Sequence, residues 1–246
     1  MVSVLAREIA AASFDLDKYS NVVADLDGTL VDGRIAQGQG KYFLKDELKR
    51  GHIHHVVLGL TNYSNVKKAA EAGEAEGLEY FFRVVAKTGC AREDKFYQYA
   101  KRYIEKHSLP HAKELIEFLT EDMPIFISTV GSKIAARAAS EYYGGAGCVG
   151  NPLARSADRS IAGIRIEIRD GKDKLEATRE MMKKLDFDIS EGIAIGNDRY
   201  DHELMKASAL AMASPLADEE TVELVRGLRG IVVEDYLSLL EELRAK

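Results

Sequence analysis

Short apolar runs that alternate with amphipathic helical patterns constrain the fold of this chain more than any other feature of its sequence. The apolar runs predict buried strands over 19–24, 124–127, 192–195, 210–213 and 231–233. Helical patterns lie between and after them, over 111–119, 133–142, 174–185, 204–208, 219–228 and 235–244. Strands that are apolar on both faces and joined through helices are typical of a parallel sheet covered on both sides. The sequence therefore predicts an α/β fold with a parallel sheet flanked by helices.

A long segment without a clear buried strand interrupts this alternation. Between residues 32 and 109 helical patterns dominate, with an amphipathic stretch over 42–50 and an Ala-, Glu- and Lys-rich stretch over 65–76. The apolar residues of 96–104 recur at helical spacing, whereas 52–60 fits a helix or a strand. We therefore predict that 32–109 is an inserted helical cap.

The remaining residues, 1–31 and 110–246, would form the α/β core. Within it, the alternating residues of 161–168 predict a half-exposed strand or a hairpin. Residues 1–14 have the pattern of an amphipathic helix, and the charges of Arg7 and Glu8 argue against a signal peptide.

The composition narrows the classes of function. The chain has 246 residues with 34 Lys and Arg against 40 Asp and Glu, a net charge of −6, which makes nucleic acid a poor partner. No apolar run approaches the roughly 20 residues of a membrane span. Cys90 and Cys148 are the only cysteines, so a disulfide framework is not expected and a cytoplasmic location fits. Nothing in the sequence indicates the oligomeric state.

Two carboxylates follow the first buried run, in the stretch VVADLDGTL at 22–30. Asp25 and Asp27 are two residues apart, so in an extended chain their side chains point the same way. Burying both is costly unless a cation or a reaction requires them. Gly28 allows the backbone to turn and to approach a ligand closely.

Polar residues also follow two other predicted strands. Ser128 and Thr129 follow the run at 124–127, and Asn197 and Asp198 follow the run at 192–195. In open α/β sheets, ligands bind outside the carboxyl ends of the strands. These residues and the two aspartates are therefore expected to meet at one site.

With these residues, the sequence resembles the haloacid dehalogenase superfamily of phosphohydrolases. The first motif of that superfamily, an apolar run followed by Asp-x-Asp-Gly-Thr-Leu, is matched at 22–30. The resemblance implies a Rossmann-like core with an inserted cap and Mg²⁺ as cofactor. It implies Asp25 as the nucleophile that forms an aspartyl phosphate, and Asp27 as the general acid and base.

The resemblance extends to a second and a third motif. The second is an apolar strand ending in Ser or Thr, whose hydroxyl holds the phosphoryl group; this implies Ser128, with Thr129 as the alternative hydroxyl, beside Gly28. The third motif is a lysine, for which Lys174 and Lys172 are both candidates. Lys174 is favoured because it directly precedes the helical pattern.

The fourth motif is altered in this chain. The family has Gly-Asp and then Asp four residues later, and here the text is IAIGNDRYDHELM, in which Gly196 and Asp201 keep the spacing. Asn197 stands where the first acid is expected, and Asp198 follows one residue late. Because Mg²⁺ prefers oxygen ligands, the set of candidate metal ligands is Asp25, Asp27, Asn197, Asp198 and Asp201.

The insert and the hairpin region most resemble the phosphoserine phosphatase-like branch, although no match to residues that read a serine is seen. The expected function is a Mg²⁺-dependent phosphatase acting on a small phosphorylated metabolite, a soluble phosphomonoester. A phosphotransferase and a non-catalytic phosphate-binding or regulatory module are the alternatives, whereas Asp27 argues against a dehalogenase. The histidines at 52, 54 and 55 are interpreted as cap packing or cap surface, and both cysteines as inert.

Overall fold

The centre of the protein is a parallel sheet of six strands. The structure is a computed structural model that describes residues 15–245, so the helix predicted over 1–14 lies outside the described residues. The strand order is β3-β2-β1-β6-β7-β8, and every neighbouring pair is parallel. The strands are β1 (Asn21–Ala24), β2 (Ile125–Ser132), β3 (Gly147–Asn151), β6 (Gly192–Gly196), β7 (Leu210–Ala213) and β8 (Ile231–Val232). The predicted α/β class with a parallel sheet is confirmed.

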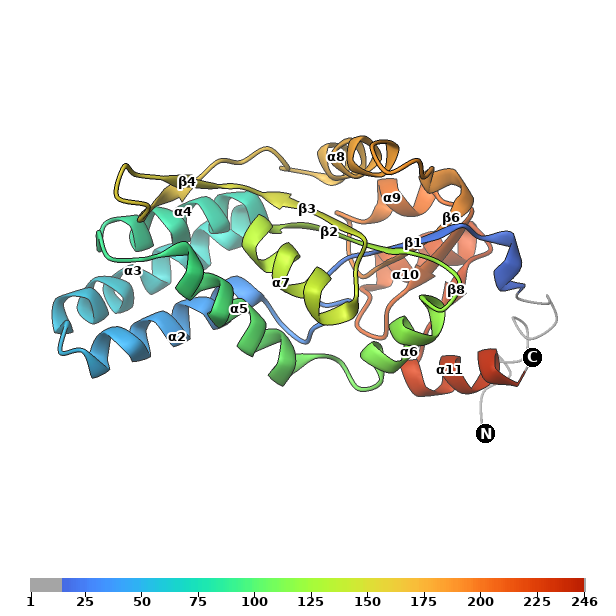
Figure 1. Cartoon of the computed structure of the whole chain (residues 1–246), viewed down its shortest axis with the longest axis horizontal. Coiled ribbons are helices and arrows are strands. Elements are labelled where there is room, and N and C mark those ends of the chain that lie inside the picture. The colour runs from blue at the N-terminus through green and yellow to red at the C-terminus, as the bar shows by residue number, and fades with distance from the viewer. Residues whose placement is uncertain (1–14, 246) are drawn as a thin grey trace.

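Helices cover both faces of this sheet (Figure 1). The covering helices are α6 (Ala112–Leu119), α7 (Lys133–Tyr143), α8 (Gly171–Lys183), α9 (His202–Ala207), α10 (Glu219–Gly227) and α11 (Tyr236–Arg244). Short 3-10 turns, η1 (Leu16–Lys18) and η2 (Ile189–Glu191), precede β1 and β6. Within residues 15–245, no helix has the length and apolar character needed to cross a membrane.

Alternate residues of each strand enter two separate hydrophobic clusters. Val22 and Ala24 of β1 pack with α6, α7 and α11, whereas Val23 packs with α8, α9 and α10. Phe126 of β2 and Ala194 of β6, which pair with Val23 in the sheet, belong to the same cluster as Val23. Side chains alternate between the faces of a strand, so a strand buried on both faces reads as a continuous apolar run. This explains why these strands were predictable.

A helical insertion separates β1 from α6 and extends the molecule to one side of the sheet (Figure 1). It comprises α2 (Ile35–Lys49), α3 (Ile53–Ala72), α4 (Glu74–Ala86) and α5 (Glu93–His107). The stretch 52–60, which the pattern left open, is largely helical. The stretch 65–76, whose composition favours helix, is helical except at Gly73, where α3 has ended at Ala72 and α4 begins at Glu74.

The insertion shares a hydrophobic cluster with parts of the chain that follow it. The hairpin predicted around 161–168 is present as β4 (Leu153–Arg155) and β5 (Ile161–Ile164), which are antiparallel. Ile161 of β5 and Ile134 of α7 are buried with Phe82 and Phe96 of the insertion. The helices of the insertion run from Ile35 to His107, within the predicted bounds of 32 and 109, and their packing extends beyond these bounds into α7 and β5.

Two further details differ from the predictions. β2 runs on to Ser132, so Ser128 and Thr129 lie within the strand instead of after it. β3 was not predicted, because Gly147 and Gly150 give it a low strand propensity. Gly150 is nevertheless needed there, since a Cβ on it would lie 3.1 Å from backbone atoms of the β2–α7 junction.

Candidate active site

Asp25 lies at the carboxyl end of β1, in the middle of the sheet. The residue before it, Ala24, pairs with Ile127 of β2 and Ile195 of β6, and the Asp25 N–H donates to the Ile195 carbonyl at 2.9 Å. Its carboxylate is buried and accepts a hydrogen bond from the Lys174 ammonium, with 2.5 Å between Nζ and Oδ1. The same ammonium donates to Oδ1 of Asp201 at 2.6 Å.

Helix α8 explains why Lys174 and not Lys172 reaches the site. The Asp170 carboxylate caps the helix by accepting from the N–H groups of Lys172 and Asp173. The residues that α8 buries, at 171, 174, 178 and 182, recur every three or four positions and so share one face. Lys172 falls on another face and is exposed. Lys174 lies inside the helix, and the prediction that it opens the helix is wrong.

Two carboxylates, those of Asp25 and Asp201, share the single positive charge of Lys174. Burial alone would lower the pKa of Lys174, but the carboxylates of Asp201 and Asp25 outweigh burial and raise it. Burial raises the pKa of Asp25 well above its usual range, and the charges of Asp201 and Asp198 add to this more than Lys174 offsets. Such crowding of acidic groups favours the entry of a further cation.

Asp27 lies beside Asp25 at the floor of a cavity. Its Oδ1 accepts a hydrogen bond from the N–H of Ile35, the first residue of α2, at 3.0 Å. Burial raises the pKa of Asp27 to about 7, helped by the charge of Glu74 and opposed by the Ile35 N–H. Gly28 has a φ of +84°, a left-handed conformation that favours glycine, and turns the chain back after Asp27. A carboxyl group of this kind can hold a proton near neutral pH.

Of the two candidate hydroxyls on β2, the structure favours Thr129. Ser128 is fully buried, and its hydroxyl is 2.7 Å from that of Thr178 on α8, which in turn donates to the Lys174 carbonyl. Thr129 points to the other side of the strand and accepts from the Gly131 N–H at 2.9 Å. Gly131 lines the cavity together with Asp27. The expectation that Ser128 holds a phosphoryl group therefore does not fit its surroundings, because its hydroxyl is already used inside the core.

Asp201 organises the β6–α9 loop instead of facing open space. Its Oδ2 accepts from the N–H groups of Asn197 at 2.8 Å and Asp198 at 3.4 Å, while Oδ1 accepts from Lys174. Both oxygens are thus engaged by the protein. This argues against the expectation that Asp201 is a direct metal ligand and makes it a positioning residue for the loop.

The Asn197 amide occupies the place that the fourth motif reserves for an acid. With its nitrogen turned toward β1, it donates to Asp25 Oδ2 at 3.3 Å, to the Asp27 carbonyl at 3.1 Å and to Thr29 Oγ1 at 3.0 Å. Turning the amide over presents its oxygen to the same groups, where Thr29 still donates at 3.0 Å. Asp25 Oδ2 and the Asp27 carbonyl oxygen would then face the amide oxygen of Asn197. Three oxygens facing one another in this way need a cation between them.

Asp198 adds a further carboxylate to this set. It is half-buried, and its Oδ1 accepts from the Tyr200 N–H at 2.9 Å. Burial raises the pKa of Asp198 to about 6, and the charges of Asp201 and Glu74 contribute. The oxygen donors of Asp25, Asp27, Asn197 and Asp198 are those that Mg²⁺ prefers. The residues present therefore fit a magnesium ion.

A cavity of about 620 Å³ runs from Asp27 into the insertion. Its walls are mostly apolar, with Phe43, Leu44, Leu78 and Phe81 among the lining side chains. Charged groups lie near Asp27, where Arg34 and Glu74 form an ion pair at 3.2 Å. Cavities of this size are typical of sites for small organic ligands.

The sequence alone did not reveal how the insertion closes on the core. The Glu74 N–H donates to the Tyr200 hydroxyl at 3.2 Å, which joins the start of α4 to the loop that carries Asp198. Arg34 and Glu74 are forty residues apart, in a region where the sequence predicted helices but no contacts between them. No local signal could have paired them, because the pairing depends on how α2 and α4 are packed.

Comparison with known proteins gives a family. Residues 22–206 match the model of the haloacid dehalogenase-like hydrolases. This range spans all the residues of the site described above. No curated protein matches the chain in sequence.

Solved structures share the fold. A substrate-bound phosphoserine phosphatase superposes with a TM-score of 0.65 at 18% identity, over 91% of this chain and 98% of the other. A phospho-aspartyl intermediate analogue of phosphoserine phosphatase gives 0.63 at 18% identity, with the same coverage. A protein of unknown function from Bordetella pertussis Tohama I gives 0.70 at 10% identity, over 88% of this chain and 98% of the other. At these identities the likeness establishes the fold, including the helical insertion.

Proposed function

The chain belongs to the haloacid dehalogenase-like hydrolase family, and from this premise we propose that it is a Mg²⁺-dependent phosphatase acting through an aspartyl phosphate on Asp25. The observation that carries the proposal is that Asp25, held by Lys174, lies two residues from Asp27, which lines the cavity. Asp25 is a carboxylate held at the end of a central strand, and Asp27 has a pKa of about 7. The pair thus combines a nucleophile with a group that can carry a proton.

In the first step, an Asp25 carboxylate oxygen attacks the phosphorus, and the bond from phosphorus to the ester oxygen breaks. The departing oxygen takes the proton of Asp27, so that an alcohol leaves instead of an alkoxide. In the second step, Asp27 accepts a proton from water as the water oxygen attacks the phosphorus. The bond to Asp25 then breaks and inorganic phosphate is released.

The surrounding residues hold the charges of this reaction. Lys174 keeps one oxygen of Asp25 in place and supplies a fixed positive charge beside the phosphoryl group. The Thr129 hydroxyl is a candidate donor to a phosphate oxygen. Asp25, the Asp27 carbonyl, Asn197 and Asp198 would hold Mg²⁺, which when bound neutralises part of the phosphate charge.

The cavity bears on the substrate. Its apolar walls lie beyond the charged groups near Asp27, so a ligand with its phosphate at Asp25 would place its remaining body against Phe43, Leu44 and Phe81. We propose a phosphomonoester of a small metabolite with an apolar body. Burial of apolar surface would contribute about 25 cal/mol per Å² to its binding.

Rapid-quench kinetics test the catalytic assignment. With Mg²⁺ present, the wild-type protein should form an acid-stable, hydroxylamine-sensitive phosphoprotein from nitrophenyl phosphate and release phosphate. Asp25→Asn should form none and lose turnover by several orders of magnitude. Asp27→Asn should slow phosphoenzyme formation far more from an alkyl phosphate than from nitrophenyl phosphate, because only the poor leaving group needs the proton.

The matched control is Asp32→Asn, which alters an exposed aspartate of the same segment and should leave both steps unchanged. Turnover by Asp25→Asn at the wild-type rate would refute the nucleophile. An equal slowing of both substrates in Asp27→Asn would refute the acid. If folded wild-type protein binds phosphate but turns over no phosphomonoester, the non-catalytic module is correct; phosphate transfer to an added alcohol instead of water would identify a phosphotransferase.

A further inference from the structure

Three potential metal ligands converge on one buried carboxylate oxygen inside the insertion. Oε2 of Glu47 lies 2.5 Å from His55 Nδ1, 2.9 Å from His52 Nδ1 and 3.3 Å from Cys90 Sγ. Glu47 is 1% exposed and His55 is 8% exposed. Within residues 15–245, Glu47, His55 and Cys90 form the one group of three or more His, Cys, Asp or Glu residues whose ligand atoms lie within 4.8 Å of one another.

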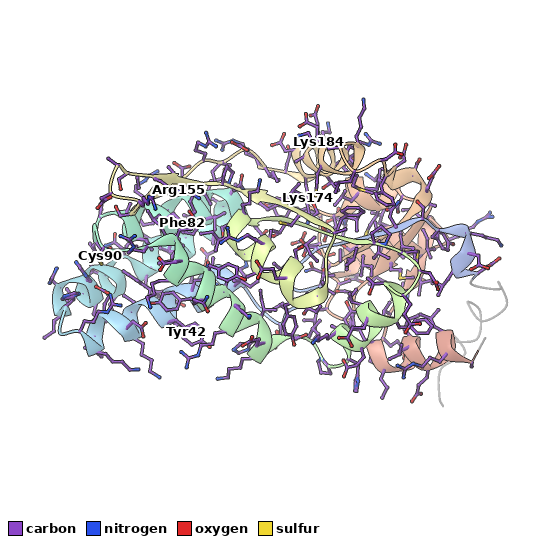
Figure 2. The ribbon with its side chains drawn as sticks, in the orientation of Figure 1. Tyr42, Phe82, Cys90, Arg155, Lys174 and Lys184 are labelled. Carbon is purple, nitrogen blue, oxygen red and sulfur yellow. The ribbon has the colours of Figure 1, made fainter. Side chains whose placement is uncertain are left out.

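The four residues come from three separate segments. Glu47 lies in the last turn of α2, His52 and His55 lie at the start of α3, and Cys90 lies in the loop before α5. Cys90 is placed near the free end of the insertion, well away from Lys174 (Figure 2). The cluster is therefore distinct from the phosphate site.

The ligand atoms of Glu47, His55 and Cys90 have nearly the spacing of three corners of a tetrahedral site. With metal–ligand bonds of about 2.0–2.3 Å, the ligands of a tetrahedral zinc site stand about 3.3–3.8 Å apart. Sγ of Cys90 is 3.5 Å from His55 Nδ1 and 3.3 Å from Glu47 Oε2, which agrees with that spacing. The shorter approach of His55 Nδ1 to Oε2, 2.5 Å, would open by less than 1 Å around an ion.

The other polar contacts leave these atoms facing inward. Arg50 occupies the second carboxylate oxygen, with its Nη1 3.3 Å from Oε1 of Glu47, so that Oε2 alone faces the cluster. The Thr88 hydroxyl is 3.4 Å from Cys90 Sγ. The His52 side chain is 43% exposed, which gives an ion a path from solvent.

The contacts around Glu47 hold its carboxylate in the charged form. Burial alone would raise the pKa of Glu47, but hydrogen bonds from His55, His52 and Cys90 outweigh it and hold the pKa at about 2. The Arg50 guanidinium, 3.3 Å from Oε1, is a cationic partner of this carboxylate. Burial raises the pKa of Cys90, so binding of a metal to its thiolate would release a proton.

We infer that Glu47, His55 and Cys90 bind a zinc ion, or a divalent transition metal of similar preference, that fastens α2, α3 and the loop before α5 together. A mixed set of thiolate, imidazole and carboxylate ligands is typical of Zn²⁺ and unlike the all-oxygen set that suits Mg²⁺. His55 and Thr88 also line the cavity, so the ion would fix part of the cavity wall.

Cobalt provides a direct test on the full-length protein. The protein is stripped with a chelator, saturated with Mg²⁺ to fill the phosphate site, and titrated with Co²⁺ while the near-ultraviolet spectrum is recorded. We expect a thiolate-to-cobalt charge-transfer band that saturates at one equivalent and disappears when Zn²⁺ displaces the cobalt. The melting temperature should rise with Zn²⁺.

Two variants identify the ligands and two serve as controls. Cys90→Ser should abolish the charge-transfer band, and His55→Gln should weaken zinc binding by at least about 100-fold, since loss of an outer-shell partner alone costs about 10–100-fold. Cys148→Ser removes the only other cysteine, and His54→Gln removes an exposed neighbour whose ring is 4.0 Å from that of His55. Both controls should bind as the wild type does.

The inference fails if the wild-type protein gives no charge-transfer band, or if Cys148→Ser loses the band and Cys90→Ser keeps it. Binding of zinc by Cys90→Ser and His55→Gln with wild-type affinity would also overturn it, and would leave a purely hydrogen-bonded cluster. Because the wild-type spectrum and the Cys148→Ser control are decisive together, the test does not depend on whether Cys90→Ser folds.

Discussion

At the scale of single residues, Asn197 is the point where this chain departs from its family. Its amide lies against Asp25 Oδ2 and the Asp27 carbonyl, the two oxygens that a magnesium ion would share. An amide in this place can hold the site together without metal by donating hydrogen bonds, which a carboxylate could not do. Asn197 therefore attracts a cation less strongly than an aspartate would, but it stabilises the site when no metal is bound.

This reading predicts the effect of Asn197→Asp. Adding a carboxylate next to Asp25 should lower the Mg²⁺ concentration needed for half-maximal activity by roughly tenfold, since a close charge is worth on the order of 1.4 kcal/mol. Without Mg²⁺, the same variant should melt at a lower temperature than the wild type, because like charges then face each other. Magnesium titrations of activity and of melting temperature measure both effects.

The comparison variant is Asp198→Asn, which removes a half-buried carboxylate from the same loop. Asp198→Asn should raise the Mg²⁺ concentration needed for half-maximal activity, but by a smaller factor than the factor by which Asn197→Asp lowers it. If Asp198→Asn instead abolishes the response to Mg²⁺ and Asn197→Asp does nothing, Asp198 is the principal ligand and our reading of the loop is wrong.

At the scale of elements, helix α8 decides which lysine belongs to the site. Its buried face carries Lys174, Thr178 and Met182, and the Asp170 cap sets where the helix begins. The ammonium of Lys174 joins α8 to β1 and to the β6–α9 loop through Asp25 and Asp201. One side chain therefore ties three elements together at the site.

Lys174→Met and Lys172→Met form a matched pair on this helix. Lys174→Met leaves two buried carboxylates without their partner and should cost about 3–5 kcal/mol of unfolding free energy, together with loss of phosphoenzyme formation. Lys172→Met changes an exposed side chain and should shift stability by no more than about 0.5 kcal/mol. Urea unfolding and rapid quench measure the two properties, and equal effects of the two variants would contradict the assignment.

At the scale of the whole molecule, the insertion and the core act as one packing unit around the cavity. Phe82 and Phe96 of the insertion are buried with Ile134 of α7 and Ile161 of β5. The Glu74–Tyr200 hydrogen bond closes the other side, near Asp27. The shape of the cavity therefore depends on both parts, and we expect the insertion to select the substrate while residues of the sheet carry out the chemistry.

A polar substitution in the cavity wall tests this division. Leu44→Gln places an amide in the apolar wall and should lower kcat/KM for an aryl or alkyl phosphate by roughly fivefold, the equivalent of about 1 kcal/mol of lost apolar contact. Turnover of a compact substrate such as acetyl phosphate should change little. Leu60→Gln is the control, because Leu60 is 64% exposed on α3 and does not line the cavity. An equal loss for both substrates in Leu44→Gln would show that the wall does not select the substrate.

The sequence alone determined the sheet and the centre of the site. Val22, Val23 and Ala24 are apolar because both faces of β1 are covered, and such runs are readable without knowing their partners. Asp25 and Asp27 follow at once, and the strand period places their side chains together. These features are local, since strand period and turn chemistry act over a few residues. Weak local signals, as in β3 with its glycines, were missed for the same reason.

Only the tertiary structure decided which polar groups meet. Lys174 and Asp25 are 149 positions apart, Asn197 and Thr29 are 168 apart, and Cys90 and Glu47 are 43 apart. The pattern HIHH at 52–55 does not indicate that Glu47 and Cys90 lie beside it. Ser128 and Thr129 are adjacent hydroxyl residues, and the structure distinguishes them by the side of β2 that each faces. Which side chain faces inward is set by packing of helices and strands that are distant in sequence. Because that packing is a property of the assembled core, no local pattern encodes it.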